Sequence, residues 1–237
     1  MALYKIYRYL VYIPWLGLWT MLSAIGVMLV APFSTLKASR WCGRMWGRGL
    51  MYLVPAKVRV VGQQHLDQQQ SYIVVSNHLS LMDIPTLYGW LKLDILWVMK
   101  KELRKVPFLG IACARLGHIF LDRSNRQVSL SQLRQLKGEL LPGMSIIIFP
   151  EGTRSRNGKL QRFKGGAFLM AKDLELPILP ISMVGSDSIL PPDGMGLRPG
   201  SAKMIIHPPI DASEVRASSP EQLRDRARQI IATVLEE

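Results

Sequence analysis

The pattern of hydrophobic and polar positions divides the chain into two parts. The first part contains an uncharged run of 28 residues, 9–36, which as one straight helix would be roughly 42 Å long. That length exceeds the apolar core of a bilayer, about 30 Å. Because two prolines and two glycines interrupt the run, we expect a helix that is tilted, kinked or broken.

Basic residues flank this run. Lys37, Arg40, Arg44 and Arg48 recur at steps of 3, 4 and 4, which places them on one stripe of a helix. This pattern is typical of a basic amphipathic helix at an anionic headgroup surface. Because basic residues also precede the run, a single span would divide them between two sides of the membrane. We therefore expect a helical hairpin or re-entrant anchor with both ends on the cytoplasmic side. A single span is the alternative, as is a cleaved signal peptide, although no clear cleavage site is present.

Beyond Pro55, short β-branched runs alternate with helical patterns. The runs predict strands at 57–62, 72–76, 95–99, 119–121, 145–149, 178–184 and 202–207. Helices are predicted at 83–91, 108–116, 126–141, 165–173 and from 220 onward. This alternation implies a layered α/β domain with a largely parallel sheet. We expect residues 1–54 to form the membrane anchor and residues 55–237 to form the α/β domain.

The pattern also predicts local features. Gly43 and Gly47 have the G-x-x-x-G spacing, which we interpret as close helix packing. Ser219 and Gln222 predict a capping box at the start of the last helix. Segment 185–200 contains several Gly and Pro residues and is expected to be a surface loop.

Charge adds a prediction about the partner. The chain has 30 Lys plus Arg against 17 Asp plus Glu, a net charge of +13. The excess lies in two blocks, +8 in residues 1–66 and +10 in residues 100–164. A nucleic-acid binder would more often interleave basic residues with aromatics or place them on a recognition helix, so we expect no nucleic acid. With two cysteines, four histidines and neither a CxxC nor an HExxH motif, we expect no metal site.

Two polar side chains follow a predicted buried strand. His78 comes soon after the run 72–76, and Asp83 opens a predicted helix five residues later. In open α/β sheets ligands bind at the carboxyl ends of strands, and a carboxylate at this spacing can hold one imidazole nitrogen. That contact would fix the ring tautomer, raise its basicity and leave the other nitrogen free to take a proton. A turn residue and a helix cap are the ordinary alternative.

A second polar segment follows the run 145–149. Its Gly152 permits a tight turn, and its Arg154 offers a planar fork suited to phosphate oxygens. A simple polar loop is the alternative. The +10 block can supply a phosphate-binding surface around His78 and Asp83.

Together these segments resemble the lysophosphatidic acid acyltransferase family, the glycerolipid acyltransferases with an N-H-x-x-x-x-D motif. Residues 77–83 match that motif, and residues 149–155 match the F-P-E-G-T-R-S block without a departure. Residues 117–123 and 176–181 are similar to the family's second and fourth blocks, and all four occur in family order. Gly165 departs modestly, because many relatives have Lys or Thr there.

The resemblance implies an enzyme, a 1-acylglycerol-3-phosphate O-acyltransferase. It would move a fatty acyl group from acyl-CoA or acyl carrier protein to the sn-2 hydroxyl of 1-acyl-sn-glycerol-3-phosphate, giving phosphatidic acid for phospholipid biosynthesis. By family analogy His78 is the general base and Asp83 orients and charges its imidazole. No cofactor or metal is implied beyond the thioester co-substrate. The implied substrate-binding residues are Asn77, Lys100, Arg123, Glu151, Gly152, Thr153 and Arg154.

Two alternatives stay open. The same chemistry could act on another lyso-lipid, such as lyso-ornithine lipid, since the motifs report thioester chemistry better than acceptor identity. A non-enzymatic protein that binds anionic lipid would explain the charge but would leave His78 and Asp83 unused. The expected location is the cytoplasmic side of a bacterial inner membrane, against its anionic surface, as a monotopic or single-span protein.

Overall fold

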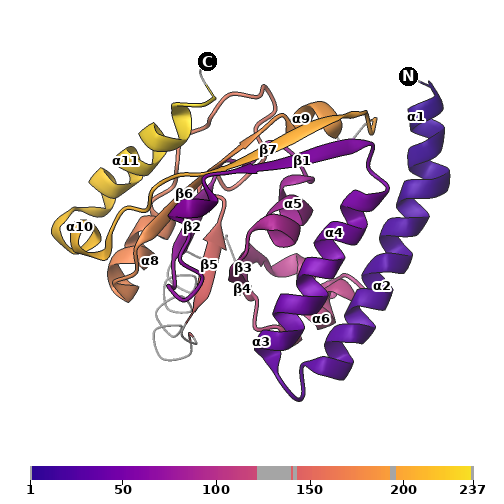
Figure 1. The fold of residues 1–237 in the computed structure, drawn as a ribbon, viewed down its shortest axis with the longest axis horizontal. Coiled ribbons are helices and arrows are strands. Elements are labelled where there is room, and N and C mark those ends of the chain that lie inside the picture. The colour runs from indigo at the N-terminus through magenta and orange to yellow at the C-terminus, as the bar shows by residue number, and fades with distance from the viewer. Residues whose placement is uncertain (1, 122–139, 141–142, 193–195, 236–237) are drawn as a thin grey trace.

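A computed structural model describes residues 2–121, 140, 143–192 and 196–235. In this part of the chain, seven strands form one sheet in the order β1-β7-β6-β2-β5-β3-β4 (Figure 1). Neighbouring strands are parallel, except β6 and β7, which are antiparallel. The strands are β1 (Ala56–Val61), β2 (Ile73–Ser76), β3 (Asp94–Lys100), β4 (Ile119–Leu121), β5 (Met144–Ile148), β6 (Ile178–Val184) and β7 (Gly200–Ile206).

The predicted layered α/β fold is confirmed, and each predicted strand is present with its ends within two residues. The β-branched run in β2 shows why. Ile73, Val74 and Val75 are completely buried, as expected for a central strand of a parallel sheet that is covered on both faces. Alternate residues face opposite sides, so Ile73 and Val75 enter one core cluster and Val74 enters the other.

Helices cover both faces of the sheet. One face carries α8 (Gly166–Leu174), α10 (Ala212–Ala217) and α11 (Pro220–Ala232), which is seen at the left of Figure 1. The other face carries α5 (Asp83–Trp90) and, beyond it, the amino-terminal helices. The predicted capping box of α11 is confirmed. Shorter elements complete the description: η3 (Gln63–His65), η4 (Lys101–Lys105), α6 (Leu109–Arg115) and α9 (Ser186–Ile189).

The amino-terminal residues form a hairpin of two long helices (Figure 1). The first comprises α1 (Ala2–Tyr7), the π-helical turn η1 (Arg8–Tyr12) and α2 (Ile13–Val30). The second comprises α3 (Thr35–Ala38), the π-helical turn η2 (Ser39–Gly43) and α4 (Arg44–Tyr52). Residues Leu3–Val30 are long and apolar enough to cross a membrane, and only 11% of the span is buried. The hairpin geometry agrees with the prediction; its position in a bilayer stays a prediction.

The expected interruption of the first helix takes a different form. Pro14 lies in the first turn of α2 and does not break the helix. The π-helical turn η1 directly precedes α2. Its wider hydrogen-bond pattern accommodates the backbone bond that is missing because proline has no N–H. The chain reverses at Ala31–Phe33 instead, and the Ser34 side chain caps the returning helix.

Gly43 and Gly47 pack the hairpin against the α/β domain. A Cβ atom on Gly47 would lie 2.6 Å from the Pro85 carbonyl oxygen, and one on Gly43 would lie 2.4 Å from the Tyr88 ring. Both distances are shorter than real Cβ contacts, so glycine allows η2 and α4 to lie this close to α5. The interpretation of the G-x-x-x-G pair as close packing is confirmed.

The prediction of a surface loop at 185–200 is wrong in part. The segment contains the short helix α9, and Ile189, Leu190 and Leu197 are buried. These apolar side chains pack into a core cluster together with residues at the start of β1. Their burial determines the structure of the segment despite the turn-forming Gly and Pro residues around them. Apart from residue 140, which is not helical, the predicted helix 126–141 lies outside the described residues, as does Arg123.

Candidate active site

His78 and Asp83 meet at the carboxyl end of β2. The His78 Nδ1 atom lies 2.8 Å from Asp83 Oδ2, and the Asp83 side chain is completely buried while that of His78 is 12% exposed. A carboxylate only accepts hydrogen bonds, so Nδ1 is the protonated nitrogen of the neutral ring. The Nε2 atom is therefore left to accept a proton from a substrate.

The backbone fixes the Asp83 carboxylate in place. Its Oδ2 atom also accepts hydrogen bonds from the backbone amides of Leu79, at 2.7 Å, and Ser80, at 2.8 Å. The turn between His78 and α5 therefore closes around this oxygen. This explains the five-residue spacing: the turn delivers Asp83 beneath the ring and presents two amides to the same carboxylate.

The loop after β5 grips the backbone of His78 from both sides. The His78 amide donates to Glu151 Oε1 at 2.8 Å, and the His78 carbonyl accepts from the Ser155 amide at 2.8 Å. The other Glu151 oxygen accepts from the Gln161 amide at 3.1 Å. Burial raises the pKa of Glu151, and the two amide donors work against that shift. Phe149 adds a stacked contact, with its ring centroid 3.9 Å from that of His78.

Glu151 and Asn77 are predicted to bind substrate, and in the structure both side chains are hydrogen-bonded to backbone groups. Both side chains are buried, and neither contributes to the cavity wall described below. The Asn77 amide pairs with the backbone of Met183, donating to its carbonyl at 2.8 Å and accepting from its amide at 2.7 Å. Asn77 thus ties the end of β2 to β6, and Glu151 ties it to the loop after β5.

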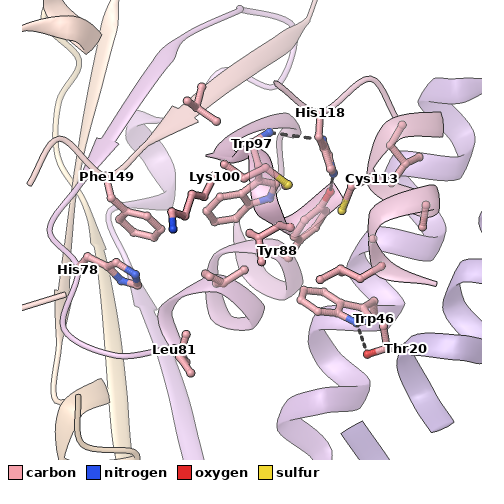
Figure 2. Close-up of a pocket in the computed structure, with 18 of the residues that line it drawn as sticks. Thr20, Trp46, His78, Leu81, Tyr88, Trp97, Lys100, Cys113, His118 and Phe149 are labelled. Atoms are coloured by element: carbon pink, nitrogen blue, oxygen red, sulfur yellow. Dashed lines mark hydrogen bonds between the residues drawn. The ribbon is translucent and has the colours of Figure 1, made fainter. Parts of the chain in front are cut away.

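A cavity of about 990 Å³ extends from His78 to the amino-terminal hairpin (Figure 2). Its wall is mainly apolar and combines residues of α2, α4, α5, β3 and α6. Aromatic rings follow one another along it: Phe149 and Trp97 have centroids 5.7 Å apart, Trp97 and Tyr88 5.6 Å, and Tyr88 and Trp46 5.8 Å. The Trp46 indole donates to Thr20 Oγ1 at 3.1 Å, joining the two hairpin helices at the far end.

The end of the cavity near His78 is basic. Lys100, Thr153, Arg154 and Arg156 line it. Within the described residues, no carboxylate pairs with the Arg154 guanidinium. Gly152 adopts φ +80°, and a Cβ atom there would lie 2.8 Å from Lys164 Nζ. Glycine thus lets the loop turn toward the cavity. Of the residues predicted to bind substrate, Lys100, Gly152, Thr153 and Arg154 line the cavity, and Arg123 lies outside the described residues.

His118, to which no role was assigned, lies in the cavity wall away from His78 (Figure 2). Its Nε2 atom is 2.5 Å from the Tyr88 hydroxyl, and its Nδ1 accepts from the Trp97 amide at 3.4 Å. Burial lowers the pKa of His118 to about 3. The ring is therefore neutral at physiological pH and acts as part of the wall. Among the described residues, no cluster of His, Cys, Asp and Glu side chains could hold a metal ion.

Comparison with known proteins shows the family to which the chain belongs. The acyltransferase family model matches residues 57–184, more than half of the 237-residue chain. The chain belongs to the acyltransferase family. The fold expectation for this acyltransferase is also confirmed by the solved structure of the 1-acyl-sn-glycerophosphate (LPA) acyltransferase PlsC from Thermotoga maritima. The TM-score is 0.72 at 27% identity, covering 93% of this chain and 96% of that one.

Curated relatives carry a common name. The chain is 31% identical over 189 residues to human 1-acyl-sn-glycerol-3-phosphate acyltransferase alpha, covering 79% of this acyltransferase and 67% of the human protein. It is 32% identical over 181 residues to a 1-acyl-sn-glycerol-3-phosphate acyltransferase of Chlamydomonas reinhardtii, covering 76% and 53% of the two chains. The chain thus spans about half to two thirds of the length of these relatives.

Sequence reasoning missed the residues that shape this acyltransferase's cavity. Trp46 and Thr20 lie in helices whose pattern indicated only a membrane anchor. The stacking of Phe149 on His78 had a signal, since Phe149 opens the F-P-E-G-T-R-S block, but that block was interpreted as a phosphate loop. Trp97 and Tyr88 lie on elements that were predicted correctly, yet a strand or helix pattern does not show which side chains border an internal cavity.

Proposed function

We propose that the protein transfers a fatty acyl group from acyl-CoA or acyl carrier protein to the sn-2 hydroxyl of 1-acyl-sn-glycerol-3-phosphate, forming phosphatidic acid. The observation that carries the proposal is the His78–Asp83 pair at the basic end of the apolar cavity. The names of the relatives support the same acceptor. The proposal needs no cofactor, since the thioester is a co-substrate.

His78 is the general base in this proposal. Its Nε2 atom takes the proton of the sn-2 hydroxyl, and the hydroxyl oxygen attacks the thioester carbonyl carbon. The resulting tetrahedral oxyanion collapses, the carbon–sulfur bond breaks, and the leaving thiolate takes the proton from the imidazolium. The Asp83 carboxylate stabilises the positive ring between these steps at 2.8 Å. No acyl-enzyme intermediate is required.

The basic end of the cavity supports a phosphate-bearing acceptor. Arg154 offers a bidentate fork for phosphate oxygens, and Lys100 and Arg156 add positive charge in the same wall. We assign Arg123, from the second family block, to the same task. The apolar length of the cavity beyond His78 suits a fatty acyl chain, since such sites bury most of the ligand surface against hydrophobic and aromatic side chains.

We place the protein on the cytoplasmic side of a bacterial inner membrane. The hairpin supports this location, because its first helix is apolar and mostly uncovered by protein. Large apolar side chains of the hairpin, such as Leu29, 68% exposed, and Phe33, 90% exposed, are left mostly uncovered by protein. A lipid surface is the environment in which such side chains lower the free energy.

A panel of acceptors tests the proposal. Purified full-length protein is given one labelled acyl thioester together with 1-acyl-glycerol-3-phosphate, lyso-ornithine lipid and neutral lysolipids. The expected result is transfer mainly to the phosphate-bearing acceptor, abolished in His78→Ala while vesicle binding is retained. If the enzyme prefers another lyso-lipid, the proposed acyl-transfer chemistry stands but the proposed acceptor is wrong. Undiminished turnover by His78→Ala would remove the base assignment.

A further inference from the structure

A basic and apolar ridge borders the cavity on the α/β domain. The ridge comprises residues 101–111, that is η4, the following turn and the start of α6. Residues 101–108 are all exposed, although four large apolar side chains lie in the ridge. Their exposed fractions are 38% for Leu103, 40% for Val106, 47% for Phe108 and 56% for Ile111. Several large apolar side chains exposed within one short segment mark a candidate interaction site.

The backbone of the ridge is strained at Phe108, whose side chain is exposed. Phe108 has φ 60° and ψ −53°, and the Leu109 amide donates to the Pro107 carbonyl at 2.6 Å across it. This is a γ-turn of the rare hand, which is strained for any residue with a side chain. Backbone strain of this kind is retained mainly at functional positions. A phenyl ring that was exposed merely by chance would not require a strained backbone.

Close backbone packing keeps the ridge in shape. The Gly110 amide donates to the Val106 carbonyl at 2.8 Å. A Cβ atom on Gly110 would lie 2.1 Å from the Arg104 carbonyl oxygen, so η4 folds directly against the start of α6. The apolar side chains are therefore presented from a fixed backbone.

Charge and position identify what the ridge meets. It carries Lys101, Arg104 and Lys105 against one acidic residue, Glu102. The opposite side of α6 packs against the hairpin, where Ala112 and Leu116 share a core cluster with Ala24 and Val27 of α2. The ridge therefore leads into a helix that packs against the apolar helix α2, in which Leu29 is also exposed. Leu103 and Leu109 also line the cavity, so the ridge is one of its rims.

We propose that the ridge is a second membrane-docking element, which inserts Phe108 and Ile111 among the lipids while its basic residues contact anionic headgroups. The inference rests on the proposed function, in which both lipid substrates reside in the membrane. Docking places the rim formed by Leu103 and Leu109 at the lipid surface. A long-chain substrate then enters the cavity from the bilayer without crossing water.

Two ridge variants and one matched control test the proposal. Phe108→Gly removes the ring and suits the positive φ, so its melting temperature should equal or exceed that of the wild type. Ile111→Ser removes the second apolar side chain. The control is Val61→Ser, because Val61 is also 46% exposed but lies at the end of β1, away from the hairpin (Figure 1). Neither Phe108 nor Ile111 lines the cavity.

Turnover is compared on long-chain acceptor in vesicles of phosphatidylcholine with phosphatidylglycerol, and on a short-chain monomeric acceptor. Each ridge variant should lower kcat/KM on vesicles about tenfold and leave the monomeric reaction within about twofold. The control should change neither. The proposal would be overturned if the wild type, the two ridge variants and the control all had the same ratio of kcat/KM on vesicles to kcat/KM on the monomeric acceptor.

Hydrogen exchange separates this inference from the proposed function. The amides of residues 103–111 should gain protection on vesicles that contain phosphatidylglycerol, including in the inactive His78→Ala protein. Unchanged exchange on those vesicles would overturn docking even if the enzyme is active. Conversely, absence of acyl transfer by the wild type would overturn the proposed function, while protection would still support docking.

Discussion

Arg40 of the hairpin forms a two-point ion pair with Asp94 at the start of β3. The Arg40 Nη2 atom lies 2.5 Å from Asp94 Oδ2, and Nε lies 3.1 Å from Oδ1. The Asp94 side chain is 8% exposed and that of Arg40 is 54% exposed. In the same stripe, Arg48 donates to the Gly89 carbonyl at 2.9 Å. Part of the predicted lipid-facing stripe therefore fastens the hairpin to the α/β domain.

We expect Arg40→Ala to destabilise the protein by about 1–2 kcal/mol, less than for a fully buried pair because Arg40 is half exposed. Asp94 would be left nearly buried without its cation. Thermal unfolding in detergent should show a melting temperature several degrees lower. Lys37→Ala, a change in an exposed residue of the same stripe, is the control and should leave the transition unchanged. Equal shifts in both variants would contradict this account.

Asp83→Asn should lower kcat about 10²–10⁴-fold, the range of general-base assistance. The amide can still accept from the Leu79 and Ser80 amides, but it cannot stabilise a positive imidazole. Because the turn is retained, KM for the acceptor should change little. Steady-state kinetics at saturating thioester measure both constants, and a loss confined to KM would show that Asp83 only shapes the binding site.

Arg154→Ala should raise KM for the phosphate-bearing acceptor about tenfold or more, since a charge-assisted bond to phosphate is lost. The value of kcat should fall less. Arg226→Ala is the matched control, because Arg226 is exposed on α11 on the opposite face of the sheet. An equal KM for phosphate-bearing and neutral acceptors in the wild type would argue against phosphate recognition by this arginine.

His118 should make stability fall at acid pH. The unfolded chain binds a proton at the ordinary histidine pKa of 6.5, whereas in the folded protein burial lowers the pKa to about 3. Between these values only the unfolded state gains the proton, so falling pH lowers the free energy of unfolding by about 1.4 kcal/mol per pH unit. His118→Gln removes this contribution, and its stability should depend less on pH between 6.5 and 4.

The same measurement controls for other groups. His207, whose pKa is also lowered by burial, and Glu151, whose pKa is raised by burial, stay in both proteins. The difference between the two pH profiles therefore reports His118 alone. If stability depends on pH in the same way in the wild type and in His118→Gln, protonation of His118 does not destabilise the folded protein.

The sheet could be predicted from the sequence because its strands are defined locally. Ile73, Val74 and Val75 form an apolar run between polar residues, and such a run is completely buried wherever helices cover both faces. The contact between His78 and Asp83 was equally local, since one turn joins them. The antiparallel pairing of β6 with β7 was not visible, because strand direction depends on the path of the connection.

The cavity and the orientation of the hairpin could not be predicted in the same way. Periodicity showed that Arg40, Arg44 and Arg48 share a stripe, but not whether that stripe meets lipid or protein. The answer depends on Asp94, which lies far away in the sequence. Glu151 illustrates the same limit: its place in a family block suggested ligand contact, whereas its oxygens are bonded to backbone amides.

The position of Trp46 and Thr20 in the cavity wall has a practical consequence. Deleting residues 1–54 to obtain a more soluble protein would remove one wall of the cavity together with the proposed membrane anchor. Loss of activity in such a truncation could not then be attributed to loss of membrane binding. A fair separation of the two effects keeps the hairpin and alters only its outward side chains, such as Leu29 and Phe33.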